Sequence, residues 1–419
     1  MRYRVQFVLA AVIAMLVFSI SGCGNGVGAG PRVRCASYPT ATTGTNFLGP
    51  RLGAHGYWLS SSEKNGIAYT CAGGHIDISH LRKASDWTMF LAAKTSEHMG
   101  NGDTEFSFKL YEPSRYYVEL TYPPDWNDLS PESRASIIHD VSIGLGEYFA
   151  FTATTWHEIL SWFGYKSTKI FPEHASAFSW EDSYSNLLGT YIAANVLKNI
   201  REFNIRDTNE YDMTMTVALD VEMEKLGIQS SSVARGAAAS VRGRWFTGDL
   251  IFVDMKKRQF DVGVDDGYVT PLITAPDIAD CSGTLPEPYP VPTLDFLAKY
   301  GFSVRFELEA REKVKRKILR VVYPDIKPRP KRIRPAIHFV RIMDFIEQDA
   351  IKHKRNIPDD DEHQVIAYGG SQDTGDRRRS RLAWETGSDI EDNCPVDFKD
   401  ILLTMFHWLE SNPCTDHIW

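Results

Sequence analysis

The longest apolar pattern in the chain begins at Ser130 and continues to Gly164. Ser130 followed by Pro131 is typical of a helix start, because Ser is a good N-cap and Pro fits the first helical position. The following residues are apolar on almost every side, which predicts a buried helix. Polar groups inside a core must be paired, neutralised or bound to metal. This helix nevertheless carries five of them: His139, Asp140, Glu147, His157 and Glu158.

Short strands are predicted before this helix and further helices after it. The strand segments are separated by turns rich in Gly, Asn and Pro, whereas the later segments repeat apolar residues with helical spacing. The predicted strands cover residues 66–71, 75–78 and 116–122, and the predicted helices cover residues 84–99, 179–192, 213–226, 336–353 and 398–410. An Asp-Gly turn predicts a hairpin over residues 260–269.

These elements predict an α+β fold, in which an N-terminal β layer packs on a buried helical core and a helical part follows. Prolines cluster between Pro286 and Pro292, as is typical of a boundary or a linker. The chain is therefore divided into a signal peptide (1–22), a lipid-anchored tether (23–30), a main α+β domain (31–290) and a mainly helical region with a mobile loop (291–419).

The N-terminus resembles the leader of a bacterial lipoprotein. Arg2 and Arg4 precede an apolar run over residues 7–20, which is too short to span a membrane and is typical of an export signal. Residues 20–23, Ile-Ser-Gly-Cys, resemble a lipobox, in which Cys23 is lipidated; the alternative is an ordinary signal peptide with an incidental Cys. Gly24 is not the Asp that retains enterobacterial lipoproteins at the inner membrane. We therefore expect anchoring to the outer membrane of the cell envelope, facing the periplasm.

Charge and cysteine content narrow the class of protein further. A formal net charge of -8 and a pI near 5.9 give no reason to expect nucleic acid as a partner.

Five cysteines remain after cleavage: Cys35, Cys71, Cys281, Cys394 and Cys414. In an oxidising compartment they allow two disulfides and a spare thiol. The shortest loops would pair Cys35 with Cys71 and Cys394 with Cys414. Since no CxxC spacing occurs, a Cys-based zinc site is not expected.

A first candidate for chemistry is the segment Gly-His-Ile-Asp-Ile-Ser-His at residues 74–80. On a strand, His75 and Asp77 point to the same face, and His80 lies just beyond them. Imidazole and carboxylate at this spacing suit a divalent metal such as zinc, or an acid/base pair. The alternative is a hydrogen-bonded structural cluster near the strand end. Apart from zinc, no cofactor is expected.

A second candidate lies at one end of the long helix. Glu147 and Glu158 are eleven residues apart, or roughly 16 Å along the axis, so they cannot serve one site. We favour His157 and Glu158, because aromatic residues surround them and a loop follows. Ser161 stands where a zincin has its second His, which excludes an ordinary zincin. The alternatives are a satisfied core histidine for His157 and a buried salt bridge for Glu158, with Arg82 or Lys166 as its partner.

A third candidate group lies on the next predicted helix, where Asp182, Ser185 and Asn186 share one face. The alternative for Asp182 is a helix-capping role. No Gly-x-Ser-x-Gly nucleophile elbow, phosphate-binding Gly-rich loop or dinucleotide fingerprint occurs in the chain.

The lipobox and four internal motifs together resemble a family of uncharacterised bacterial lipoproteins, known as a domain of unknown function. The motifs are residues 74–82, residues 156–164, residues 176–189 and residues 260–267. The similarity covers most of the mature chain up to Pro292. Because the family has no assigned activity, the resemblance implies a place in the envelope and not a mechanism.

We therefore expect an envelope protein with a hydrolase-like site, with zinc as the candidate metal, acting on an envelope polymer or lipid. His75, Asp77 and His80 would be ligands or acid/base groups, Glu158 the general base, and His157 and Asp182 orienting groups. The rival hypothesis is a non-catalytic lipoprotein that binds a partner or ligand and buries these residues in a hydrogen-bond network.

Overall fold

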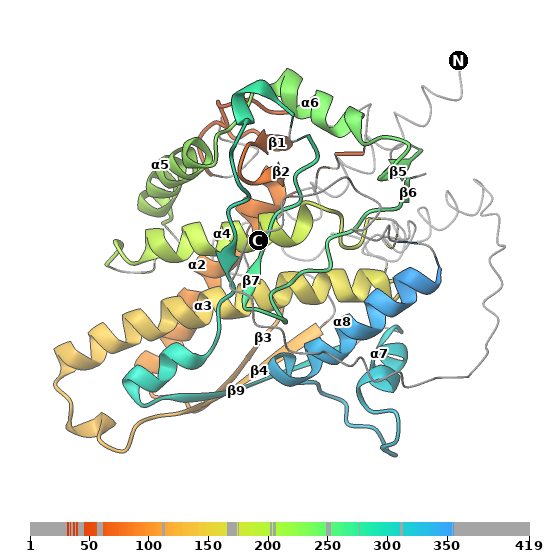
Figure 1. Cartoon of the computed structure of the whole chain (residues 1–419). Helices are drawn as coiled ribbons and strands as arrows, with labels where there is room; N and C mark the ends of the chain where they lie inside the picture. Colours follow the sequence, from red (N-terminus) through yellow and green to blue (C-terminus); the bar gives the residue numbers. More distant parts are fainter. Residues whose placement is uncertain are drawn as a thin grey trace, which may run out of the picture. The chain divides into compact units, whose positions relative to one another are not determined.

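Three helices form the centre of the protein in a computed structural model. They are α2 (Ile78–Gly100), α3 (Pro131–Trp162) and α4 (Asp182–Leu197), and α2 packs against both of the others (Figure 1). Gly189 lets α4 approach α2 closely, because a Cβ atom there would lie 2.1 Å from the Leu81 carbonyl oxygen. The predicted start of α3 is confirmed, since the Ser130 hydroxyl accepts a hydrogen bond from the Ser133 N–H.

The structure describes residues 32, 34, 37, 39–40, 46–56, 62–110, 114–165, 174, 176–201, 203, 207–248, 253–275, 277–310, 313–353 and 355. These residues belong to one compact unit. The lipobox with Cys23, the predicted helix 398–410, and Cys35, Cys394 and Cys414 lie outside them. Among the described helices, none is both long and apolar enough to cross a membrane.

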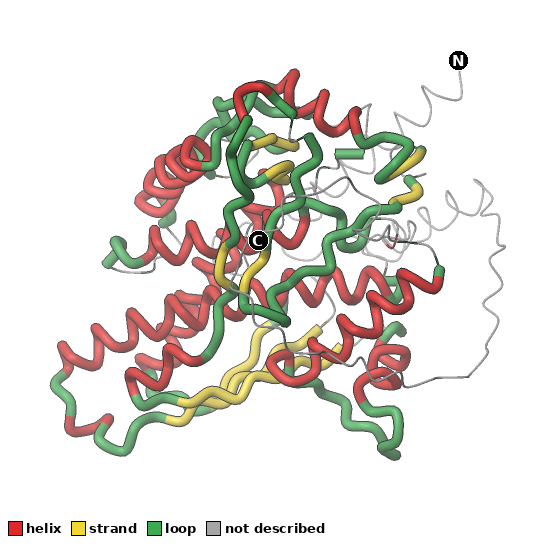
Figure 2. Tube along the Cα trace, viewed as in Figure 1, coloured by secondary structure: helices red, strands yellow, loops and turns green. Residues whose placement is uncertain are grey.

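A three-stranded antiparallel sheet covers α3 with one face (Figure 2). Its strand order is β3 (Glu105–Phe108), β4 (Ser114–Thr121), β9 (Ser303–Ala310), and Tyr116 lies opposite Leu308. Side chains of β4 alternate between buried and more exposed positions, as expected for a sheet with one face against the core. Phe306 of β9 packs on Phe149 of α3 with ring centroids 4.5 Å apart.

The mixed α+β fold is thus confirmed, although the sheet takes its third strand from the C-terminal part of the chain. Helices α7 (Lys315–Val322) and α8 (Pro335–Lys352) follow β9, and α8 packs on both α3 and β9. The described residues after Pro292 are therefore built into the same sheet and core. The domain limits themselves remain a prediction.

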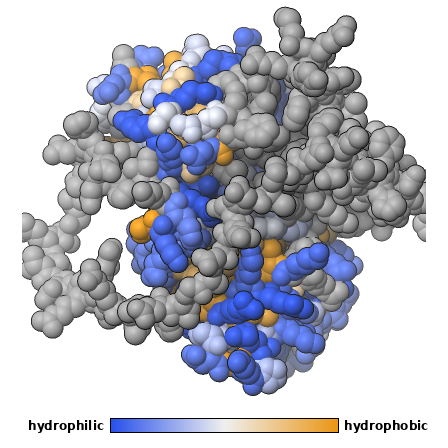
Figure 3. Space-filling view, turned by 90° about the vertical axis from the view of Figure 1, so that its right-hand side faces the viewer, coloured by the Kyte–Doolittle hydropathy of each residue, from blue (hydrophilic) through white to orange (hydrophobic). Residues whose placement is uncertain are grey.

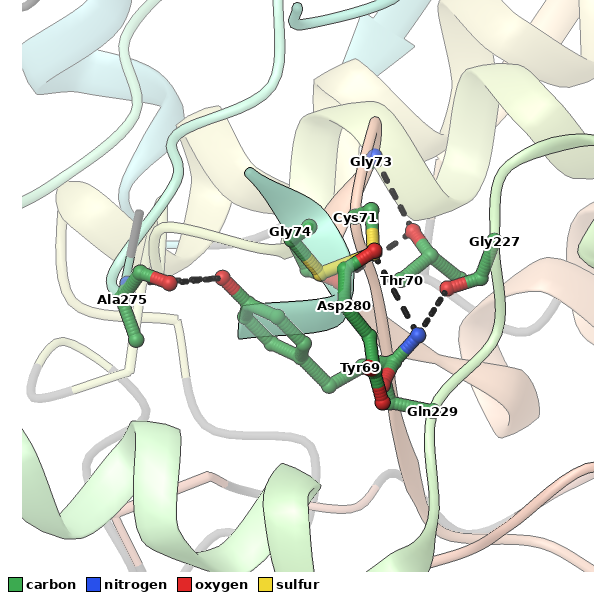
Figure 4. Close-up of a disulfide and its surroundings, with 10 residues drawn as sticks. Tyr69, Thr70, Cys71, Gly73, Gly74, Gly227, Gln229, Ala275 and Asp280 are labelled. Carbon is green, nitrogen blue, oxygen red and sulfur yellow. Dashed lines mark hydrogen bonds between the residues drawn. A yellow bond between two sulfur atoms is a disulfide. The ribbon is translucent and has the colours of Figure 1, made fainter. Parts of the chain in front are cut away.

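The hairpin of β1 (Ile67–Thr70) and β2 (Gly74–Asp77) runs directly into α2. A disulfide joins Cys71, just after β1, to Cys281, so the expected Cys35–Cys71 pairing is wrong (Figure 4). The two cysteines are 210 positions apart, and a shortest-loop argument could not select them. The fold brings them together because Tyr69 of β1 also donates a hydrogen bond to the Ala275 carbonyl, near Cys281.

The remaining elements are α5 (Asn209–Lys225), α6 (Ser231–Ser240), the pairs β5 (Phe246–Thr247) with β6 (Asp254–Met255) and β7 (Tyr268–Val269) with β8 (Tyr289–Pro290), and the 3-10 turns Trp126–Asp128, Ala279–Cys281 and Asp295–Tyr300.

The hairpin predicted over residues 260–269 is wrong. Tyr268 and Val269 pair with Tyr289 and Pro290 instead, and the Asp261 carboxylate accepts hydrogen bonds from the N–H groups of Gly263 and Thr270. This side-chain turn replaces the backbone pairing that a hairpin needs.

Candidate functional site

The junction between β2 and α2 places His80. Asp77 is the last residue of β2 and the N-cap of α2, and its Oδ1 accepts hydrogen bonds from the N–H groups of Ser79 (2.7 Å) and His80 (3.3 Å). The sequence reading placed His80 in a turn, whereas the structure places it in the first turn of the helix. The Asp77 cap therefore fixes the direction in which the imidazole leaves the backbone.

His80 lies between two carboxyl groups. Its Nδ1 is 2.9 Å from Oδ1 of Asp182, at the start of α4, and 3.4 Å from Oδ2 of Asp77. Glu158 of α3 and Glu181 interact electrostatically with members of the same group. We call these five residues, Asp77, His80, Glu158, Glu181 and Asp182, the carboxyl cluster. Strand β2 and the helices α2, α3 and α4 with its N-cap contribute to it.

The Glu158 side chain is hydrogen-bonded to Phe178, a residue with a strained backbone conformation. Its Oε2 accepts a hydrogen bond from the Phe178 N–H at 2.9 Å, and the Phe178 carbonyl accepts one from the Gln259 N–H at 3.0 Å. Phe178 has a φ of 55°, in the left-handed region that bulky residues rarely adopt. Backbone strain of this kind persists only when surrounding contacts enforce it, and it is concentrated at functional sites.

The turn after Phe178 positions two further carboxyl groups. The Ser179 hydroxyl donates a hydrogen bond to Glu181 Oε2 at 2.6 Å, and the Ser179 N–H donates one to Asp182 Oδ2 at 3.1 Å. Both acidic side chains are buried. The N-cap of α4 is Glu181, so Asp182 fixes the turn before the helix rather than capping it, and its other oxygen faces His80.

Burial and mutual repulsion raise the pKa values of these carboxyl groups. Burial raises the pKa of Asp182 to about 7, and burial together with Asp182 raises the pKa values of Glu158 and Glu181. Burial also lowers the pKa of His80 to about 4, with Lys83 acting in the same direction. The cluster thus combines carboxyl groups that burial makes harder to ionise with an imidazole that burial makes harder to protonate.

One nearby cation was not anticipated from the sequence. Arg258 donates a hydrogen bond to the Ala177 carbonyl. Burial, together with the charge of Arg355, lowers the pKa of Arg258 to about 10, and the charges of Glu158 and Asp182 act in the opposite direction. Arg258 thus acts on Glu158 through its charge, whereas the sequence suggested Arg82 or Lys166 as a salt-bridge partner. Lys166 lies outside the described residues, and Arg82 belongs to a different group.

The carboxyl cluster is almost closed to solvent. The side chains of His80 and Asp182 are 9% and 6% exposed, and Glu158 is buried. His157 is half-buried on α3 and packs edge-on against Tyr165. It contributes a charge that acts on Glu158 and Asp182, so the structure does bring His157 near the other candidates.

His75 is separate from the cluster. Its Nε2 lies 3.1 Å from the Ala234 carbonyl, and its Nδ1 accepts a hydrogen bond from Trp180 at 3.4 Å and lies 3.3 Å from the Thr274 hydroxyl. Burial lowers its pKa to about 4. Both ring nitrogens are therefore used in core contacts, which does not fit a metal ligand.

The part of the chain that the structure describes contains no group of three or more His, Cys, Asp or Glu side chains arranged to hold a metal ion. The zinc hypothesis for His75, Asp77 and His80 therefore has no support from the geometry.

The other polar residues of α3 lie apart from the cluster. Asp140 is exposed and accepts a hydrogen bond from the Tyr300 hydroxyl, while His139 Nε2 lies 2.7 Å from the Ile200 carbonyl oxygen. Burial raises the pKa of Glu147 to about 7, opposed only by Lys198. These three residues therefore lie outside the carboxyl cluster, and the choice of the His157–Glu158 end as the site stays a prediction.

A second buried polar region, which we call the ionic network, was not predicted. It consists of Arg34, His55, Glu63, Arg82 and Asp86 and ties the segment before β1 to α2. Nε of Arg34 is 2.7 Å from Glu63 Oε1, and His55 Nε2 is 3.0 Å from Asp86 Oδ1. Burial acts to raise the pKa of Asp86, but Arg34 and His55 outweigh it and hold this pKa well below its usual range.

The fold and the carboxyl cluster define an α+β protein with acid/base groups buried in a helical core. The chain belongs to the family described as protein of unknown function (DUF4056), whose model matches residues 51–262. The whole carboxyl cluster lies in this range, whereas the lipobox, β9, α7 and α8 lie outside it. Neither a curated protein nor a solved structure matches the chain.

Sequence reasoning missed Arg258 and Phe178, and it gave Glu181, which it grouped with Asp182, no role of its own. Arg258 lies in a segment without periodicity. A left-handed Phe has no sequence signal at all. A usable signal did exist for Asp77, since Asp followed by Ser two positions later is a common N-cap pattern.

Proposed function

We propose that this chain is a lipid-anchored envelope protein whose carboxyl cluster performs acid/base chemistry of the hydrolase type. The observation that carries the proposal is the position of His80 Nδ1, 2.9 Å from Asp182 and 3.4 Å from Asp77 in a core that also buries Glu158. Groups with raised and lowered pKa values packed together are typical of acid/base sites.

The strained backbone at Phe178 supports the same assignment. A core that only needed a stable turn could use Gly at this position and avoid the left-handed conformation of a large side chain. Instead, Glu158 is held on the Phe178 N–H. This geometry fixes one carboxyl oxygen and leaves the other oxygen for chemistry.

Each member of the cluster has a distinct role in the proposed reaction. His80 takes a proton from the attacking water, and Asp182 stabilises the imidazolium that forms; Asp77 orients the ring. Glu158, whose pKa is raised by burial, is the acid: it gives a proton to the leaving group and recovers one from His80 afterwards. His157 lies at the more exposed side and contacts the substrate. Glu158 is thus an acid here, whereas the sequence reading made it a base.

Zinc takes no part in this scheme, because His75 uses both nitrogens in the core. Metal analysis of the purified protein tests this point. Zinc bound at one equivalent and lost in His80→Ala would contradict the metal-free assignment.

The lipid anchor is proposed from the sequence alone. The apolar run at residues 7–20 and the lipobox ending in Cys23 support it. Growth with labelled palmitate should label the wild-type chain and leave Cys23→Ser unlabelled. Label retained in Cys23→Ser would contradict acylation at this residue.

Hydrolysis is tested with the Cys23→Ser chain, incubated with peptidoglycan sacculi or with envelope phospholipids and followed by mass spectrometry of the products. Loss of a positioned acid or base lowers rates by about 10²–10⁴-fold, so His80→Gln and Glu158→Gln should abolish product formation. The matched control is Glu147→Gln, because Glu147 lies on the same helix and also has a raised pKa. Equal rates in Glu158→Gln and the control would contradict the proposal.

A second candidate function is supported by the burial of the cluster. With His80 only 9% exposed, the same residues can form a closed hydrogen-bond network in a lipoprotein that binds a partner. In that case no envelope fraction yields a product, and His80→Gln lowers stability only.

A further inference from the structure

The described residues form an open cleft where β9, the loop 323–334 and the start of α8 meet. Its volume is about 780 Å³, and the side chains that line it include Arg305, Lys331, Arg332 and Arg334, with Glu307 as the carboxylate among them. None of these residues belongs to the carboxyl cluster. The cleft therefore requires its own explanation.

Two of the arginines are fixed at the cleft by Glu307. Arg305 donates to Oε1 of Glu307 at 2.8 Å, and Arg332 donates to Oε2 at 3.3 Å. Arg332 also lies over the ring of Tyr117, with its guanidinium carbon 3.5 Å from the ring centroid. Because both oxygens of one carboxylate are shared, the two guanidinium groups are oriented in advance and keep further N–H donors for a ligand.

The positive charge of the cleft exceeds what the protein neutralises. Four cationic side chains face Glu307, and Arg305 also lies 3.7 Å from Glu119, so two carboxylates leave an excess of two positive charges. Lys331 and Arg334 are exposed, and neither forms an ion pair with another described residue. A phosphate group suits this excess of cations, because its oxygens accept bidentate hydrogen bonds from arginine.

The surroundings favour a phosphate that belongs to a lipid. Ile326 in the same loop and Ile337 in the first turn of α8 are 49% and 53% exposed. Figure 3 views the side on which α7 and α8 lie, and its lower part is mainly hydrophilic with hydrophobic patches between. Cations mixed with exposed apolar side chains are typical of surfaces that rest on lipid headgroups.

We propose that this cleft binds the phosphate of an anionic lipid headgroup. Arg305 and Arg332 hold the phosphate oxygens, and Lys331 and Arg334 add charge at the rim. The proposal does not depend on the chemistry of the carboxyl cluster.

Vesicle cosedimentation tests this proposal with the full chain carrying Cys23→Ser, so that acylation cannot contribute. The probes are vesicles of phosphatidylcholine with and without phosphatidylglycerol, and calorimetric titration with inorganic phosphate at the same ionic strength. The variant is K331E/R334E. Its matched control is K109E/R201E, which reverses one Lys and one Arg that are also exposed.

Wild-type chain should bind only the vesicles that contain phosphatidylglycerol. Since each cation near an anionic surface contributes on the order of 1 kcal/mol, K331E/R334E should weaken binding by at least about tenfold, and K109E/R201E by less than about twofold. The neutral variant K331Q/R334Q should fall between them, which guards against an effect of misfolding.

Two results would overturn the proposal. Equal loss in the control variant would mean that net charge alone explains the binding. Saturable phosphate binding that K331E/R334E abolishes, without vesicle binding, would make a soluble phosphate compound the ligand and would refute the lipid assignment.

Discussion

The carboxyl cluster and the ionic network are both buried, and both contain carboxylates and histidine, yet their charges are arranged in opposite ways. In the ionic network each carboxylate lies beside arginine, and the pKa of Asp86 is lowered. In the carboxyl cluster the acids lie beside one another, and the pKa of Asp182 is raised to about 7. The network holds its charges at all physiological pH values, whereas the cluster can exchange protons.

The difference shows how a structural polar core can be told apart from a candidate site. Opposite charges in contact compensate for each other's loss of hydration. They stabilise the fold only while every partner is present, because removal of one leaves a buried charge unpaired. Buried acids that repel one another cost free energy, which makes such an arrangement a candidate for a functional site. Three variants test this comparison.

The largest effect is expected for Asp86→Asn in the ionic network. It removes one of the two carboxylates that contact Arg34, and the only carboxylate beside His55 among the described residues; breaking a buried pair costs about 3–5 kcal/mol. Because the pKa of Asp86 is lowered in the folded state, the loss should be complete at neutral pH and should shrink as pH falls below about 4. Denaturant unfolding at several pH values measures it. A loss below about 1 kcal/mol at neutral pH would show that the network is dispensable.

The opposite sign is expected for Asp182→Asn in the carboxyl cluster. A folded-state pKa of about 7, above the unfolded value, means that ionisation of Asp182 costs stability as pH rises from about 4 through 7. Asn resembles the protonated acid, so the variant should be more stable than wild type by about 2 kcal/mol at pH 8 and no different at pH 4. The same variant should lose any hydrolytic activity. Destabilisation at pH 8 would show that Asp182 acts as a paired, ionised group.

The smallest effect is expected for Glu147→Gln, which distinguishes a single buried acid from a cluster. Burial alone raises the pKa of Glu147 to about 7, but its side chain is half-buried and partly screened by solvent. We expect a gain of about 1 kcal/mol at pH 8 and unchanged activity. Reduced activity in this variant, measured beside Asp182→Asn, would mean that Glu147 belongs to the site. It would contradict the choice of the His157–Glu158 end of α3.

Local signals in the sequence were reliable where a short segment determines its own structure. Ser130 and Pro131 start α3, Gly227 follows the end of α5 with a φ of 74°, and α8 lies within one residue of its predicted limits. Each of these outcomes depends on caps and periodicity within a few residues.

Signals that depend on distant partners were unreliable. The Asp-Gly turn near residue 266 did not form its hairpin, because β8 supplied the partner for Tyr268 and Val269. Cys71 forms its disulfide with Cys281, which lies 210 positions away in the sequence. His75 and Asp77 were read as one ligand pair, but Trp180 and Ala234 bound the imidazole while Asp77 capped α2.

The sequence by itself determined that this chain has a buried helix with charged residues that need an explanation, because apolar periodicity and composition are properties of the chain alone. It also marked residues 74–80 and 157–158 as the segments with candidate chemistry. Only the tertiary structure decided that Asp182 lies 2.9 Å from His80 and that Arg34 neutralises Asp86. The effect of one charge on another depends on their separation and burial, and both are set by packing between residues that are far apart in the chain.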